Sequence, residues 1–175
     1  SQIHYGFIIP HRRAIEPLVN DTNPWGISAE VSRLRYTQSA WKSCNCYSQN
    51  GIALTYFNFD NPVLGSSINL VAFAEPYLTL RNINIMLRAG LGLSYLTKVY
   101  HWESNPDNVL FSSPLSGILL IQLTTRVWLN KNLGVRLSGA YQHISNGGMQ
   151  QPNLGMNFPT VSVGAEYSIG RIGLV

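Results

Sequence analysis

The chain has 175 residues, of which 45% are apolar and only 11% are charged, and its formal net charge is +4. A soluble domain usually carries about 25% charged residues, so this composition disfavours an ordinary soluble surface. No apolar run approaches the roughly 18 residues that a membrane-spanning helix needs, and the length fits one domain over residues 1–175.

Apolar and polar residues alternate with a period of two through most of the chain. From Ile83 to Tyr95 the odd positions are apolar while the even positions are mostly polar or small, and the same alternation recurs from Leu115 to Leu129. Helical periodicity is nowhere persuasive. The pattern predicts eight β-strands, at residues 2–9, 25–36, 49–58, 68–79, 83–97, 115–129, 133–145 and 157–169.

Alternation alone leaves open which face points outward, because a soluble ligand-binding barrel would place its apolar face inside. The other face carries six charged residues among small ones: Glu30, Glu75, Arg88, Arg126, Arg136 and Glu166. Opposite charges can pair in a narrow, filled lumen, so we expect this face to point inward. The fold class expected is therefore all-β, an eight-stranded antiparallel transmembrane β-barrel. It must be closed, because an open sheet edge would leave backbone groups unpaired in hydrocarbon.

The links between the predicted strands alternate in length. Short links near 80–82 and 130–132 alternate with longer ones at 10–24, 98–114 and 146–156. Outer-membrane barrels combine short periplasmic turns with long extracellular loops in this way.

Residues 37–48 depart from the scheme, because they form a long link where a short turn is expected. The link contains Cys44 and Cys46. One intervening residue is too few for an unstrained disulfide in an extended chain, so we interpret them as two incidental thiols.

Four aromatic residues, Trp25, Tyr95, Tyr141 and Tyr167, fit an interfacial girdle. His4, His11 and His101 have no neighbours that suggest chemistry, so we expect them at the surface or in loops.

The predicted strand 133–145 carries two polar residues on its apolar face. The parity that runs through Tyr141 continues onto His143 and Ser145, which should therefore point toward lipid. A polar group in that position costs free energy unless it has a partner or a purpose. In the next predicted strand Asn157 shares the outward face, and antiparallel pairing could bring the three side chains together.

These residue types suit nucleophilic catalysis. A serine hydroxyl is a weak nucleophile until a base takes its proton, and a third group must hold the imidazole in the right tautomer. The developing oxyanion needs donors, for which Asn146, the Gly147 backbone amide and Asn153 are candidates. In the competing interpretation, the polar residues of the strands only mark the membrane boundary, and Asn146, Gly147 and Asn153 only form turns in the following loop.

The wider string resembles a known family. His143-Ile144-Ser145-Asn146-Gly147-Gly148, followed by Gln151-Pro152-Asn153-Leu154-Gly155-Met156-Asn157, is similar to the active-site segment of the PagL-like lipid A deacylases, also called acyloxyacyl hydrolases. The similarity is sharp over residues 133–167. The opening His4-Tyr5-Gly6-Phe7 and the segment Asn61-Pro62-Val63-Leu64-Gly65 look like Bacteroidetes members of that family.

The resemblance implies a serine esterase that removes an ester-linked acyl chain, typically the 3-O-linked one, from lipid A, with His143 as base and Ser145 as nucleophile. In that family a Glu completes the triad fourteen residues after the His, where this chain has Asn157. A neutral amide can orient an imidazole but cannot stabilise the imidazolium by charge. Glu103 is the most plausible substitute carboxylate, whereas the parity of Glu166 aims it into the lumen.

The partner implied is lipid A of lipopolysaccharide, reached sideways from the outer leaflet of a bacterial outer membrane, with no cofactor, metal ion or nucleic acid. We expect that a signal peptide has been removed, and a homodimer stays open. The first alternative is a non-catalytic barrel of the same family with a structural or lipid-binding role. The second is a soluble barrel with its faces inverted. The sequence leaves open the acyl position, the chain-length preference and the third catalytic group.

Overall fold

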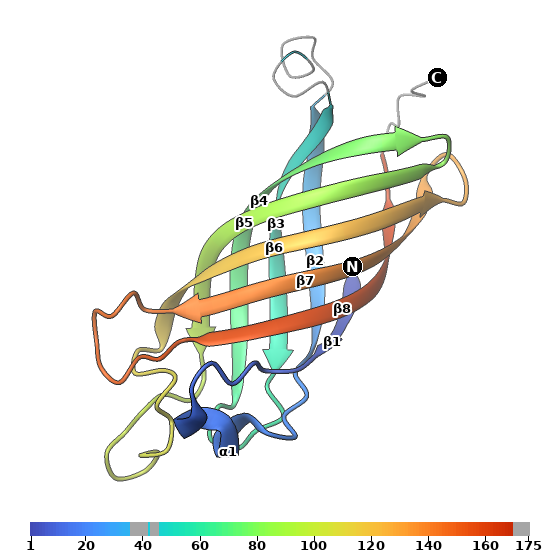
Figure 1. Cartoon of the computed structure of the whole chain (residues 1–175). Helices are drawn as coiled ribbons and strands as arrows, with labels where there is room; N and C mark the ends of the chain where they lie inside the picture. Colours follow the sequence, from blue (N-terminus) through green and yellow to red (C-terminus); the bar gives the residue numbers. More distant parts are fainter. Residues whose placement is uncertain (36–41, 43–45, 170–175) are drawn as a thin grey trace.

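Eight antiparallel strands close into a barrel in the computed structural model, which describes residues 1–35, 42 and 46–169 (Figure 1). Each strand pairs with the next one along the chain, and β8 pairs with β1 to close the barrel. The strands are β1 Gln2–Gly6, β2 Trp25–Arg35, β3 Tyr47–Asn58, β4 Ser66–Leu80, β5 Ile83–Leu96, β6 Leu115–Trp128, β7 Leu133–Ser145 and β8 Met156–Tyr167. The predicted fold class is confirmed.

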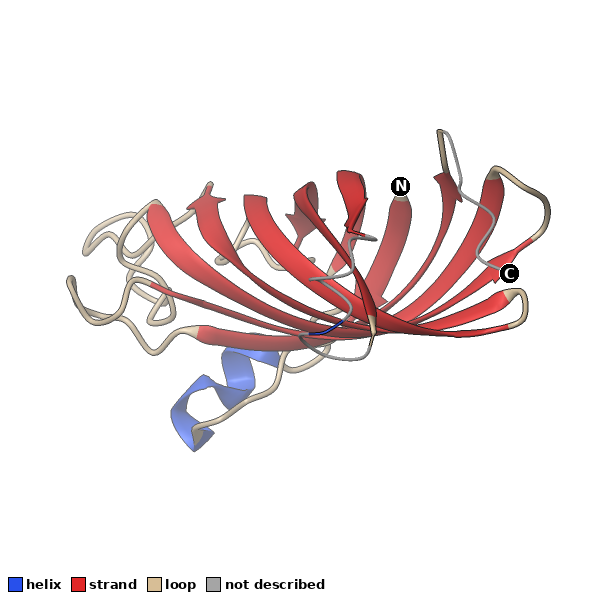
Figure 2. Cartoon of the chain, turned by 90° about the horizontal axis from the view of Figure 1, so that it is seen from above, coloured by secondary structure: helices blue, strands red, loops and turns tan. Residues whose placement is uncertain are grey.

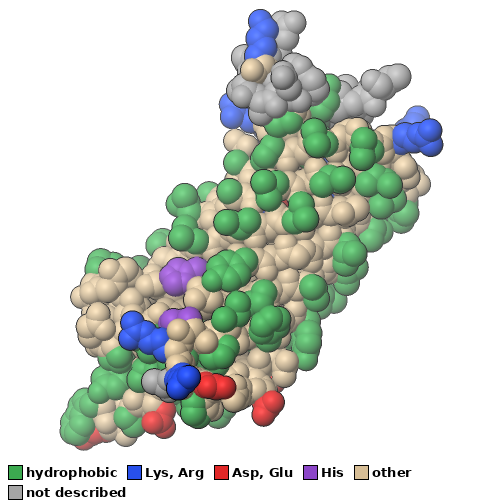
Figure 3. Space-filling model, in the orientation of Figure 1, with side chains coloured by type: hydrophobic (Ala, Val, Ile, Leu, Met, Phe, Trp, Pro, Cys, Tyr) green, Lys and Arg blue, Asp and Glu red, His purple; other side chains and the backbone are tan. Residues whose placement is uncertain are grey.

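The apolar face of the strands is the outer face. Along β6 and β7 exposed and buried residues alternate, and the exposed ones include Leu119, Ile121 and Leu137. Figure 3 shows hydrophobic side chains distributed along the barrel wall, with charged side chains near its two ends. The inverted, soluble barrel is therefore wrong. The four predicted girdle residues, Trp25, Tyr95, Tyr141 and Tyr167, are all exposed.

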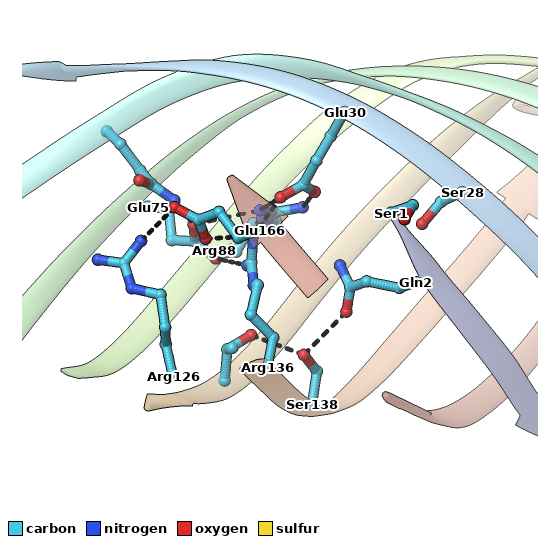
Figure 4. A network of polar contacts seen from close by, with 12 residues as sticks. Ser1, Gln2, Ser28, Glu30, Glu75, Arg88, Arg126, Arg136, Ser138 and Glu166 are labelled. Carbon is cyan, nitrogen blue, oxygen red and sulfur yellow. Dashed lines mark hydrogen bonds and ion pairs between the residues drawn. The ribbon is translucent and has the colours of Figure 1, made fainter. Parts of the chain in front are cut away.

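The lumen holds a network of ion pairs, as predicted from the polar face (Figure 4). Each of three arginines meets a glutamate from another strand: Arg88 Nη1 lies 2.7 Å from Glu30 Oε2, Arg136 Nη2 lies 2.9 Å from Glu75 Oε1, and Arg126 Nη1 lies 2.7 Å from Glu166 Oε1. Arg88 and Arg136 are almost completely buried. Because every one of these charges has a partner, the network lies in the lumen without leaving an isolated charge.

The loop end of the lumen is filled by apolar side chains. Phe57, Ile144 and Phe158 from the strands pack with Phe59 and Phe111 from the loops, and all five are fully buried. The long loops and α1 gather at this end of the barrel, as Figure 2 shows from above. The packing stabilises the loops next to the end of β7 and the beginning of β8.

The first predicted strand is shorter than expected. β1 ends at Gly6, but the chain continues beside β8, because Phe7 N donates to Pro159 O at 3.3 Å and Ile9 N donates to Asn157 O at 2.9 Å. The following loop contains two short helices, η1 Arg13–Ile15 and α1 Glu16–Val19. Elements of three and four residues are too short to produce a helical period, which explains why the sequence did not predict them. Within the described residues, no helix is long and apolar enough to cross a membrane.

Two minor predictions are corrected. Cys46 is disulfide-bonded, so it is not an incidental thiol, while Cys44 and most of the link 37–48 lie outside the described residues. His4 is not at the surface: it points into the lumen from β1, and its Nε2 lies 2.9 Å from Ser28 Oγ. His11 and His101 are exposed in loops, as expected.

Candidate active site

His143 and Asn157 form a directly opposed pair across β7 and β8. Their Cα positions are partners in the strand register, both side chains are half-buried, and His143 Nδ1 lies 2.7 Å from Asn157 Oδ1. Both belong to the outward-facing set of their strands. The alternation of the pleat explains this, because opposed residues of an antiparallel pair project from the same face of the sheet.

This hydrogen bond determines the tautomer of His143. The carbonyl oxygen Oδ1 of Asn157 can only accept, so Nδ1 must donate its proton. In the neutral imidazole the lone pair then lies on Nε2. His143 is therefore held in the form that can take a proton through Nε2.

Ser145 lies two residues further along β7, and its hydroxyl oxygen accepts two hydrogen bonds. Gly147 N donates to Ser145 Oγ at 3.1 Å and Asn153 Nδ2 donates at 2.9 Å. Two convergent N–H donors stabilise negative charge on an oxygen at this place. Gly147 and Asn153 are two of the three donors suggested by the sequence.

Gly155 lies close to both the imidazole and the serine. A Cβ at this position would lie 3.1 Å from His143 Cε1 and 3.4 Å from Ser145 Cβ, and the backbone has φ +69°. Both the left-handed backbone and the close approach favour glycine here. No hydrogen bond joins His143 to Ser145 directly among those formed by the described residues, which is common in catalytic pairs without bound substrate.

Asn146 plays a different part from the one suggested by the sequence. Its buried side chain donates to Ser112 Oγ at 3.0 Å and to Gln150 O at 2.9 Å, and its Oδ1 accepts from Gly148 N at 2.9 Å. All of these bonds stay within the loops. The Asn146 backbone N donates to Asn153 Oδ1 at 3.3 Å, so Asn146 orients the amide group that reaches Ser145.

The loop 146–155 is anchored to the loop 97–114. Leu154 N donates to Val109 O and Gly155 N to Leu110 O, each at 3.2 Å, and Ser112 Oγ donates to Gln150 O at 2.7 Å. Sequence analysis missed Ser112. A serine in a loop carries no periodic signal. Its hydrogen bonds to Gln150 and Asn146 form only because two loops distant in sequence approach each other.

Neither glutamate considered as a substitute contacts the imidazole. Glu103 is exposed, and its backbone N donates to His101 Nδ1 within its own loop at 3.3 Å. Glu166 points into the lumen and pairs with Arg126, as parity predicted. Among the described residues, no carboxylate forms a hydrogen bond or ion pair with His143, because Asn157 occupies the position beside Nδ1.

Residues 20–166 match the sequence model of a protein family described as Lipid A 3-O-deacylase (PagL). Among solved structures, a similar one is the crystal structure of the outer membrane enzyme PagL, which is 15% identical in sequence and superposes with a TM-score of 0.64. The alignment covers 94% of this chain and 97% of that chain. At this identity the structural likeness supports the fold alone. No curated protein matches the sequence.

Proposed function

The chain belongs to the PagL family of lipid A 3-O-deacylases, and on that premise we propose that it is a serine esterase of the bacterial outer membrane that removes an acyl chain from lipid A. One observation carries the proposal: the Ser145 hydroxyl accepts bonds from two N–H donors beside an imidazole whose proton is on Nδ1. Such an arrangement supplies a nucleophile, a base and oxyanion donors within one segment of chain.

The first half of the reaction forms an acyl-enzyme. Ser145 Oγ attacks the ester carbonyl carbon while its proton moves to His143 Nε2, and the carbonyl π electrons move onto oxygen. In the free enzyme the Gly147 amide and the Asn153 side chain donate to Oγ. In the intermediate Oγ and the oxyanion are bonded to the same carbon, so the same two donors can bind the oxyanion. Collapse of the intermediate expels the sugar oxygen, which takes the proton from His143.

The second half releases the fatty acid. A water molecule attacks the acyl-enzyme while His143 Nε2 takes one of its protons, and the tetrahedral intermediate again places negative charge near the two donors. Breaking the bond to Ser145 returns that proton to Oγ. The products are a free carboxylic acid and a lipid A molecule with one more hydroxyl group.

Substrate access follows from the position of the triad on the wall. His143, Ser145 and Asn157 lie on the outer face, at the end of β7 and the beginning of β8, while apolar side chains fill the adjacent lumen. Lipid A therefore approaches sideways within the leaflet. The 3-O-linked chain is the ester that the family description favours.

A second candidate function is a non-catalytic lipid-binding barrel of the same family. Asn157 is the observation that favours it, because the resemblance predicts a glutamate there and an amide provides no charge for the imidazolium.

Deacylation of lipopolysaccharide in detergent separates the two functions. The protein should release one hydroxyacyl chain per lipid A molecule, measured by mass spectrometry with fragmentation to identify the 3-O position. Ser145→Ala should release none, while Ser32→Ala, at an exposed serine of β2, should match the unmodified protein. Equal release by Ser145→Ala, or no release by the unmodified protein, would contradict the esterase mechanism.

A further inference from the structure

Ser145 is flanked on the β6 side by a residue without a side chain. In the register of β6 and β7 the partner of Ser145 is Gly117, and the two residues share the outer face. The neighbouring outward residues of β6 are large and apolar, namely Leu115, Leu119 and Ile121. Gly117 therefore leaves a gap in the apolar wall directly beside the proposed nucleophile.

The fold itself gives no reason for a glycine at position 117. A Cβ there would meet only one atom, Ser145 O, at an ordinary contact distance of 3.4 Å. Its φ is not among the positive values found in the described residues, unlike that of Gly155. A glycine inside a strand weakens it, and often marks a place where a ligand comes close to the backbone.

The surroundings of the gap are hydrocarbon-like. Leu93, the β5 partner of Gly117, is 55% exposed, and Leu115 and Leu119 are exposed to a similar degree on either side along β6. None of the groups that would act on the ester belongs to β6: His143 comes from β7, Asn157 from β8, and Gly147 and Asn153 from the loop between these two strands. An acyl chain extending from the ester carbonyl can thus lie over Gly117 with leucines on three sides.

We propose that Gly117 forms the floor of the subsite for the acyl chain of the ester that Ser145 attacks, so that residue 117 controls which chains fit. This inference rests on the proposed esterase function and identifies part of its substrate site. A side chain at position 117 would occupy the space of the first carbons of a long chain. A very short acyl group would still reach Ser145.

The test compares two esters across a size series at one position. Gly117→Ala, Gly117→Val and Gly117→Leu are assayed on lipid A and on p-nitrophenyl acetate, both in detergent. We expect kcat/KM on lipid A to fall progressively with side-chain size, by about tenfold or more for leucine, while the acetate ester is hydrolysed within about twofold of the original rate.

Gly139→Leu is the matched control. Gly139 is also a lipid-facing strand glycine with nothing near its Cβ position, but it lies six residues before Ser145 on β7, about 20 Å along the strand. It should leave both activities unchanged. Gel mobility without heating, which distinguishes folded barrels, verifies that each variant has folded.

The outcomes are distinguishable. Full lipid A activity of Gly117→Leu, or an equal loss in Gly139→Leu, would overturn the subsite alone. An equal loss of both activities in Gly117→Leu would show that residue 117 only supports the serine. An original protein inactive on both esters would overturn the esterase function itself.

Discussion

β7 contributes to two polar clusters that lie on opposite faces of the same wall. The lumen network consists of Glu30, Glu75, Arg88, Arg126, Arg136 and Glu166, and its charges are three positive and three negative. The wall site consists of His143, Ser145, Asn157, Asn153 and the Gly147 amide, and with a neutral imidazole it carries no formal charge. Arg136 and His143 lie on the same strand with opposite parity, and Arg136 is enclosed by ion pairs while His143 faces outward.

The difference in charge between the two clusters indicates that the lumen network serves stability and that the wall site serves the proposed chemistry. A charge facing hydrocarbon is costly, whereas charges in the lumen can be paired across strands. The lumen network therefore holds paired charges, while the wall site, in the proposed mechanism, forms a charge only when Ser145 transfers its proton to His143. Substitutions in the two clusters should consequently affect different properties.

The largest effect is expected from removing the proposed base. His143→Ala should lower the deacylation rate by about four orders of magnitude, because Ser145 then has no proton acceptor. The free energy of unfolding should change by less than about 1 kcal/mol, since the side chain is half-exposed. Deacylation kinetics and urea unfolding measure the two quantities. If the free energy of unfolding fell by as much as the activation free energy of deacylation rose, the wall site would contribute to stability as well as to catalysis, and the proposed difference between the two clusters would be wrong.

Breaking the lumen network should have the next largest effect, and on stability. Arg136→Ala leaves the buried Glu75 and the partly buried Glu30 with one arginine fewer, which should lower the free energy of unfolding by about 3–5 kcal/mol. Leu137→Ala, at a residue that is exposed on the wall, is the adjacent control and should change it far less. Urea titration in detergent measures both. Equal stability of the two variants would mean that the network contributes little.

The orienting amide should have an intermediate effect on catalysis. Asn157→Leu removes the acceptor of the Nδ1 proton and should lower kcat about 100-fold, because the imidazole loses its fixed tautomer. Asn157→Glu adds the charge that the resemblance predicts at this place, and should raise kcat about tenfold by stabilising the imidazolium. Should both variants match the original protein in kcat, Asn157 would have no part in the reaction.

The smallest effect is expected from the loop anchor. Asn146→Ala and Ser112→Ala each remove hydrogen bonds that hold the loop 146–155, and should lower kcat about tenfold by loosening Asn153. If the two residues act through one contact, the double variant should be little worse than either single variant. Additive losses would indicate independent functions.

The sequence by itself determined the strands, their faces and the residues available for chemistry. A strand pleat has a period of two, so alternation from Ile83 to Tyr95 sufficed to assign an outer and an inner face. The same parity predicted that Arg136 and Glu166 point inward and that His143 and Ser145 point outward. The structure places all four side chains on the predicted faces.

Only the tertiary structure decided how those residues meet. Strand register placed Asn157 opposite His143, whereas the sequence had also offered Glu103 as the residue beside the imidazole. Register also placed Gly117 beside Ser145. The bond between Asn146 and Ser112 joins two loops that are far apart in sequence. Parity determines the face on which a side chain lies, but register and loop packing depend on backbone hydrogen bonds between distant segments, which local periodicity does not encode.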